Sequence, residues 1–148
     1  MKKTNTPKAK TLEIKFIKII KSISKAQNIA LKIQQQADNI PAEVTLPNDN
    51  GMFASCAASM PYMVYEYLTR AMETIDNNLK HHTEIKDILD NDVTVLISNA
   101  SDLAKALYLL VKNFYSQVNI LKNETSITEL LSCTKNLYDV ELAEIFKV

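Results

Sequence analysis

Residues 89–121 read LDNDVTVLISNASDLAKALYLLVKNFYSQVNIL. Apolar residues recur along this stretch at alternating steps of four and three, a spacing that places them on one face of an α-helix. The stretch therefore predicts a helix over about 92–122 with one face buried. The residues of that face are Leu89, Val93, Leu96, Ala100, Leu103, Leu107, Leu110, Phe114, Val118 and Leu121.

The same alternation occurs near the start of the chain and predicts a helix over about 11–40. Additional apolar side chains at Ile17, Ile20 and Leu31 widen its apolar face beyond the narrow seam of a two-stranded coiled coil. This helix is therefore expected to pack against more than one neighbour. The repeating positions are Leu12, Phe16, Ile19, Ile23, Ala26, Ala30, Ile33, Ala37 and Ile40.

Two further helices are predicted, over about 52–82 and 127–147. A loop between Pro41 and Pro47 precedes the first of them, and Pro61 either starts that helix or kinks it. Ser126 and Glu129 have the spacing of a capping box, in which each side chain binds a backbone N–H at the start of a helix. The sequence thus predicts four helices.

Turn-forming residues are scarce, with one glycine and four prolines among 148 residues. Folds made of β-strands need turn residues every ten residues or so, which leaves long helices as the main structure. We predict an all-α fold, either an elongated four-helix bundle or a coiled-coil-like helical oligomer. Residues 11–148 are expected to form a single helical domain, preceded by a disordered basic tail over residues 1–10.

The charges are unevenly distributed along the chain although the net charge is zero. Residues 1–32 hold nine lysines and one acidic residue, whereas residues 33–148 hold eight basic and sixteen acidic residues. Such asymmetry indicates that the basic segment lies on the acidic body of its own or a sister chain, or that it binds another anionic surface.

Lysines also bear on the expected location of the protein. Lys15, Lys18 and Lys21 interrupt the apolar stretch 12–23, and no run approaches the ~18 uninterrupted apolar residues of a membrane span. We therefore expect a cytoplasmic protein without a signal peptide or a transmembrane segment, which associates at most peripherally with a granule or membrane.

The sequence contains no recognisable motif for catalysis or cofactor binding. One glycine does not suffice for a phosphate-binding loop, and His81 and His82, beside Glu84 and Asp87, are interpreted as the polar end of a helix. Cys56 and Cys133 lie far apart and lack metal-ligand spacing, so we expect buried, reduced thiols. The expectation is a protein that is not an enzyme and has no cofactor and no metal.

Four features of residues 78–146 occur together: Asn78-Leu79 at the start of a helical stretch, the small residues of SNASDLAK (98–105), ETSITELL (124–131) opening the last helix, and Tyr138 seven residues past Leu131. With these features the segment resembles the phasin family, whose members coat intracellular polyhydroxyalkanoate granules. The resemblance implies a protein without catalytic activity that coats hydrophobic granule or membrane surfaces through amphipathic helices.

Candidate surface- or partner-binding residues follow from the first helix and from the aromatic residues of the third. Lysines on one side of the first helix would face anionic lipid, and its wide apolar face and the aromatic side chains would contact a hydrophobic surface. These residues are Phe16, Ile17, Lys18, Ile20, Lys21, Lys25, Lys32, Tyr108, Phe114 and Tyr115.

Several partners are consistent with this sequence. The long helices favour a homo-oligomer, and the expected surface is a hydrophobic granule or an anionic membrane. The alternative function is a helical protein-interaction module, such as an adaptor, chaperone or effector, that binds a protein partner through its basic N-terminal helix or its acidic body. Nucleic acid is not expected because Arg70 is the only arginine and no aromatic residues alternate with the lysines.

Overall fold

The computed structural model describes residues 7–37, 52–114 and 124–147, and every regular element in these ranges is helical. The all-α prediction is confirmed. The elements are α1 (Pro7–Ala37), α2 (Met52–Leu79), α3 (Ile85–Ile88), α4 (Asn91–Phe114), α5 (Glu124–Asn136), the π-helical segment η2 (Leu137–Leu142) and α6 (Ala143–Phe146).

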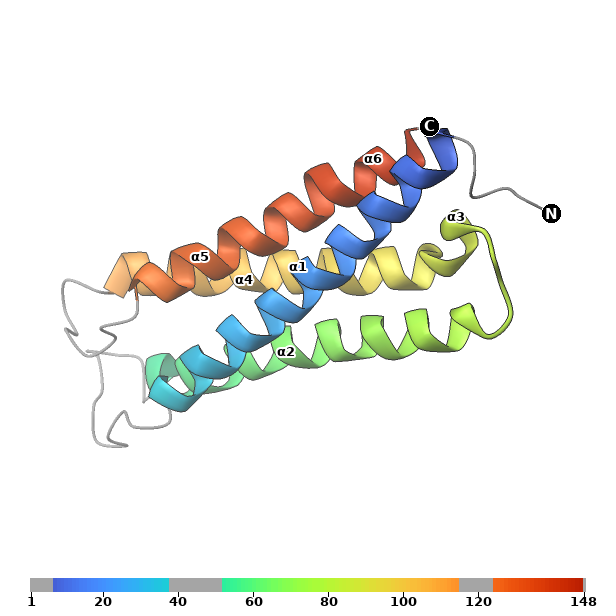
Figure 1. The fold of residues 1–148 in the computed structure, drawn as a ribbon. Helices are drawn as coiled ribbons and strands as arrows, with labels where there is room; N and C mark the ends of the chain where they lie inside the picture. Colours follow the sequence, from blue (N-terminus) through green and yellow to red (C-terminus); the bar gives the residue numbers. More distant parts are fainter. Residues whose placement is uncertain (1–6, 38–51, 115–123, 148) are drawn as a thin grey trace.

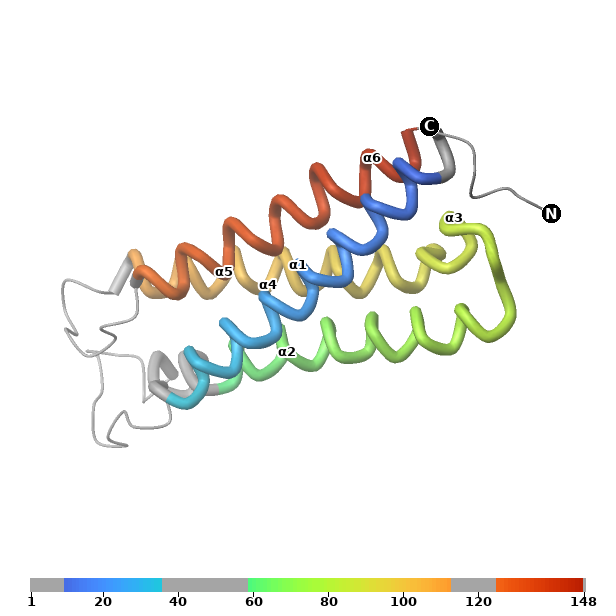
Figure 2. The backbone as a smooth tube through the Cα atoms, viewed as in Figure 1, coloured from blue at the N-terminus to red at the C-terminus, as the bar shows by residue number. Residues whose placement is uncertain are grey.

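The helices form an elongated bundle (Figure 1), whose long members are α1, α2, α4 and the segment formed by α5, η2 and α6. Helices α1 and α4 each contact both α2 and α5, whereas the described parts of α1 and α4 do not contact each other. Figure 2 shows α5, η2 and α6 as one continuous helical rod, whose end lies beside the start of α1. One chain therefore closes its own core, as the four-helix-bundle form of the prediction requires.

The core of the bundle is formed by inward stripes on each long helix. Along α4 the fully buried positions again step by four and three, while Leu96, Leu103 and Leu110 lie on the flank and are half-buried against the core. The predicted face is therefore correct in part, because Ile97, Ala104 and Val111 take the core positions that were expected for the three leucines. The apolar face is broad because α4 packs against two neighbours. The buried stripe of α4 consists of Val93, Ile97, Ala100, Ala104, Leu107 and Val111.

The first helix begins at Pro7, four residues before the predicted start, so residues 7–10 are helical and only residues 1–6 of the expected tail lie outside the described ranges. Proline suits the first position of a helix because its fixed φ is helical and its missing N–H would have no intrahelical partner there. The predicted ends of the first and third helices, over residues 38–40 and 115–122, also lie outside the described residues.

Pro61 lies inside α2, which begins nine residues earlier at Met52 and ends at Leu79, three residues before the predicted end. The proline therefore does not start the helix. A proline in a helix removes one backbone hydrogen bond and usually destabilises it. Here Pro61 is buried, so the apolar contact of its ring offsets part of that cost.

The connection between α2 and α4 is fixed by two polar side chains. Asn78 is buried, and its Nδ2 donates hydrogen bonds to the backbone oxygen of Ile88 and to Oδ2 of Asp90, both at 3.0 Å. Oδ1 of Asp90 accepts a hydrogen bond from the backbone N–H of Val93 at 3.0 Å. Asp90 therefore caps the N-terminus of α4, and aspartate is among the residues that favour this position.

The last helix begins at Glu124, three residues before the predicted start. Ser126 consequently lies in the first turn of α5 and not ahead of it, so the predicted helix start at the Ser126–Glu129 capping box is displaced. Further along, the π-helical segment has Leu137 and Leu142 both buried, five residues apart. This spacing matches the wider i→i+5 turn of a π-helix and keeps both leucines in the core.

Among the described residues, the stretch Asn91–Lys112 of α4 is the one helix that has the length and composition of a membrane span. The core helix of a bundle has the same composition. In this fold the inward residues of α4 are buried by α2 and α5, and 28% of the apolar stretch lies inside the bundle.

Leucine-to-alanine substitutions on the two sides of α4 should differ strongly in their effect on stability. Leu107 is completely buried, so Leu107→Ala should lower the free energy of unfolding by about 2–4 kcal/mol through lost burial and a residual cavity. Leu109 is 45% exposed, and Leu109→Ala is the matched control, with an expected loss of less than about 1 kcal/mol. Urea unfolding followed by circular dichroism measures both, and equal losses would contradict this packing of α4.

Removing the cap of α4 should also destabilise the bundle. Asp90→Ala deletes the acceptors for Val93 and Asn78, and we expect a loss of about 1–2 kcal/mol in the free energy of unfolding. Asp87→Ala removes an exposed carboxylate from the same connection and should change stability by less than about 0.5 kcal/mol. Thermal and urea unfolding of the two variants test the role of Asp90 as a cap. Equal stability of the two variants would contradict that role.

Candidate functional site

The outward side of α1 combines lysines with two isoleucines, all of them exposed. Counted from position 14, the other five residues lie 3, 4, 7, 11 and 18 positions further on, all close to whole turns of the helix, which keeps them on one side. The opposite side of α1 is buried in the bundle. We call this surface the lysine face, and it consists of Ile14, Ile17, Lys18, Lys21, Lys25 and Lys32.

The two isoleucines of the lysine face are among the most exposed large apolar side chains in the described part of the chain. Ile14 is 67% exposed and Ile17 is 52% exposed. Single exposed apolar residues are common on protein surfaces. Here, however, two of them lie one turn apart and next to lysines, the arrangement expected of a helix that lies on an anionic apolar surface.

The structure brings only part of the predicted set together. Ile17 and the four predicted lysines share the lysine face, whereas Phe16 and Ile20 are partly buried against the core on the other side of α1. These two side chains pack inward because the apolar stripe of α1 is wide enough to contact α2 and α5 at once.

The predicted aromatic residues do not form a surface with α1. Tyr108 of α4 is partly buried against the core, and Nζ of Lys112 lies 5.9 Å from the centre of its ring, within the range of a cation–π interaction. Phe114 is the last residue of α4, and its side chain lies outside the described part, as does Tyr115 altogether. Since α1 and α4 are not neighbours, Tyr108 is remote from the lysine face.

Polar contacts with the C-terminal rod hold α1 in its orientation. The Oγ of Ser22 donates to both carboxylate oxygens of the buried Glu141, at 2.5 and 2.8 Å. Nearer the start of α1, Lys15 forms an ion pair with Glu144 at 3.3 Å. A hydrogen bond to a charged acceptor contributes more than an exposed ion pair, so we assign the main role to Ser22 and Glu141. The basic helix thus lies partly on the acidic body of its own chain.

A thiol completes this polar cluster. Sγ of Cys133 lies 3.5 Å from the backbone oxygen of Ser22, to which it donates a weak hydrogen bond. Burial raises the pKa of the Cys133 thiol, Lys25 opposes that shift, and the nearby carboxylates of Glu141 and Glu129 add to it. A thiol that stays protonated is a poor nucleophile and metal ligand. Cys133 is half-buried, less than predicted, and the side chain of Cys56 lies outside the described part.

The histidine pair lies at the end of the bundle where α3 contacts α1 and α6. His81 and His82 are exposed in the turn that follows α2. Within the described ranges, no group of three or more histidine, cysteine, aspartate or glutamate side chains is arranged to hold a metal ion.

No protein-family model, no curated protein and no solved structure matches this chain. The resemblance to phasins therefore stays a prediction, and the site is interpreted from its own geometry.

Two features of the site were missed by the sequence interpretation. Ile14 lies seven residues before Lys21 and four before Lys18, so the spacing of the lysines would have placed it on their face. The contact between Ser22 and Glu141 joins residues 119 positions apart, and no local pattern signals it.

The pH dependence of alkylation should report the environment of Cys133. With Cys56 replaced by serine, the iodoacetamide reaction should reach its half-maximal rate at a higher pH than in an unstructured cysteine peptide, because the raised pKa lowers the thiolate fraction at any given pH. Lys25→Met should move the midpoint further up, whereas the matched control Lys18→Met should leave it in place. A midpoint at or below that of the peptide would contradict the proposed environment.

Proposed function

We propose that this protein is a non-catalytic, phasin-like surface-binding protein that lies on hydrophobic granules or membranes carrying anionic lipid. The observation that supports the proposal is the lysine face, where Ile14 and Ile17 are exposed among four lysines. The phasin resemblance supports the choice of a granule, and the absence of a recognisable catalytic motif from the sequence supports a role without chemistry.

The binding free energy of such a contact is the sum of modest contributions from its lysines and isoleucines. Each lysine near an anionic lipid surface contributes about 1 kcal/mol, and the contribution disappears beyond a Debye length. Burial of an exposed isoleucine side chain contributes at most about 1.5–3 kcal/mol. Four lysines and two isoleucines therefore support reversible binding, which suits a protein that exchanges between the surface and the cytoplasm.

The proposed contact does not require the bundle to open. The apolar stripe of α1 stays packed against α2 and α5, and only the side that already faces solvent meets the lipid. Phe16 and Ile20, which were predicted to contact the surface, are therefore not part of the proposed contact, because both pack against the core of the bundle. The contact surface is narrower than the sequence pattern indicated.

A protein partner is the second candidate. Apolar residues at positions i and i+3 of an exposed helix, such as Ile14 and Ile17, are typical anchors when a helix docks in a groove. As an adaptor, chaperone or effector, the protein would bind an acidic partner through the same lysine face. Recovery of one stoichiometric protein, with no binding to vesicles or granules, would favour this function.

Vesicle flotation tests the first proposal. The intact protein should float with phosphatidylcholine vesicles that contain phosphatidylserine, and not with phosphatidylcholine alone. Lys18→Gln together with Lys21→Gln should weaken binding by roughly 25-fold, at about fivefold for each lysine. Ile14→Ser together with Ile17→Ser should weaken vesicle binding by at least tenfold. Losses of similar size are expected when the variants are tested with polyhydroxyalkanoate granules.

Matched controls use residues of the same type on other helices. Val95 and Leu109 are exposed apolar residues of α4, and their double serine variant should bind vesicles as the intact protein does. Lys105→Gln with Lys135→Gln controls for net charge. If both lysine pairs weaken binding equally, the lysine face has no special role and the proposal is wrong.

A further inference from the structure

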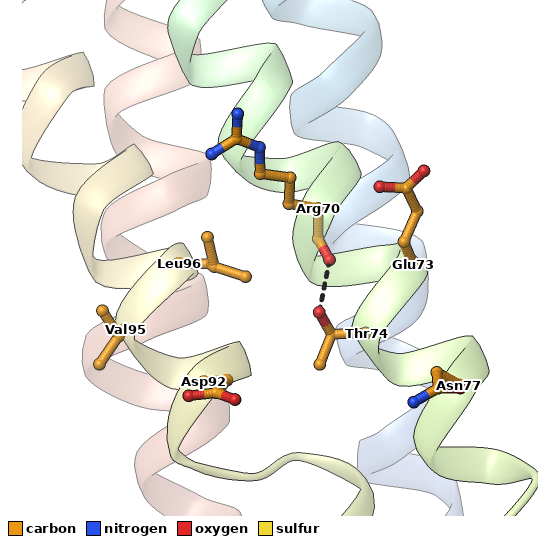
Figure 3. A pocket seen from close by; sticks show the side chains of 7 residues that line it. All are labelled: Arg70, Glu73, Thr74, Asn77, Asp92, Val95 and Leu96. Atoms are coloured by element: carbon orange, nitrogen blue, oxygen red, sulfur yellow. Dashed lines mark hydrogen bonds between the residues drawn. The ribbon is translucent and has the colours of Figure 1, made fainter.

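The outer side of the bundle between α2 and α4 is hollowed along much of its length. A hollow of about 560 Å³ lies between the C-terminal half of α2 and the start of α4 (Figure 3). In that view the side chains of Arg70 and Leu96 are directed into the space from opposite helices. A second hollow, toward Tyr62, shares Arg70 with the first. A third, toward Ala106, shares Met63 and Tyr67 with the second. We call this continuous surface the α2–α4 groove.

Apolar side chains line the groove and remain accessible. Tyr62 and Met63 are each 43% exposed and Val95 is 47% exposed, while Leu96 and Leu103 lie deeper and are half-buried. Contiguous exposed apolar surface of this kind is typical of a protein contact.

The groove is also acidic. Glu66, Glu73, Asp92 and Asp102 line it, and Arg70 is the one basic residue among its described lining side chains. The lysine face has the opposite character, with four lysines and no acidic side chain. The two surfaces are therefore complementary both in charge and in their apolar residues.

We infer that the α2–α4 groove of one molecule receives the lysine face of α1 from a second copy of the same chain. The arrangement of the helices suits this contact, since α1 lies on the outside of the bundle and the groove is lined by the neighbouring helices α2 and α4. A helix packs in such a furrow at axial distances of about 8–10 Å. The lengths agree as well: residues 14–32 and residues 62–77 span roughly 28 and 24 Å at 1.5 Å per residue.

A single molecule cannot make this contact with itself. Its α1 touches α2 through the opposite side of the helix, where Nε2 of Gln27 donates to Oγ1 of Thr69 at 3.1 Å, and the described parts of α1 and α4 do not meet. Each molecule thus presents one face and one groove. Used head to tail, this contact produces rings or growing chains of molecules.

The contact has a regulatory consequence that rests on the proposed function. Self-association covers the same lysine face that would lie on an anionic surface, so the two contacts exclude each other. In solution, each molecule would bury Ile14 and Ile17 in the groove of a neighbour. Binding to an anionic surface would then detach molecules from the assembly one by one.

Analytical ultracentrifugation of the full chain tests the contact. The average mass should rise with concentration above 16.7 kDa at low salt and return toward that value in about 1 M NaCl, where the Debye length is about 3 Å. Two variants should each block growth: Ile17→Ser with Lys21→Ser on the face, and Glu73→Lys with Asp102→Lys in the groove. All four residues are exposed, so circular dichroism should show unchanged folding.

Mixing the two variants is the decisive experiment. The face variant keeps an intact groove and the groove variant keeps an intact face, so the mixture should form a 1:1 pair that does not grow. Asp76→Lys with Asp87→Lys carries the same charge change outside the groove and should assemble like the intact protein. A mass independent of concentration, assembly of the groove variant, or a mixture that stays monomeric would each overturn the inference.

Vesicle binding separates this inference from the proposed function. The groove variant should float with phosphatidylserine vesicles at least as well as the intact protein, whereas the face variant should not. If the face variant still floats but the mixing experiment succeeds, the surface proposal fails and the contact between copies stands. If the groove variant assembles normally and the face variant alone loses vesicle binding, the contact between copies fails and the surface proposal stands.

Discussion

Burial of the inward stripe of α4 against α2 and α5 is the contact on which the rest of the structure depends. It includes the completely buried Leu107, and it begins where Asp90 caps the helix. Because α4 meets both neighbours, it fixes the distance between α2 and α5, and α1 then closes the fourth corner. The outward faces of α1, α2 and α4 are consequences of this arrangement, and they carry both proposed contacts.

The functional interpretation depends on which apolar residues the bundle leaves uncovered. A wide apolar stripe on an isolated α1 would include Phe16 and Ile20, but the bundle buries them and leaves Ile14 and Ile17 outside. The burial of the apolar stripe of α1 and the part-buried hydrogen bonds from Ser22 to Glu141 together fix the rotation of α1 about its axis. Contacts inside the bundle thereby determine which side of α1 faces solvent.

Charge separation gives the protein two surfaces of opposite sign at zero net charge. Near neutrality, electrostatic repulsion between copies is weak, which permits association. The lysine face can be satisfied by an acidic groove or by anionic lipid, and both contacts weaken with salt. A protein with these properties would respond to the composition of nearby surfaces without any catalytic step.

The sequence by itself determined the helical class and the approximate extent of the long helices, because periodicity is a local property. It also determined that α1 is basic. Only the tertiary structure decided that α2 runs through Pro61, that Tyr108 is remote from α1, and that Phe16 and Ile20 pack against the core. These outcomes depend on contacts between residues far apart in the chain, such as Ser22 and Glu141, and a helix's own pattern does not specify which part of a wide apolar face its neighbours will cover.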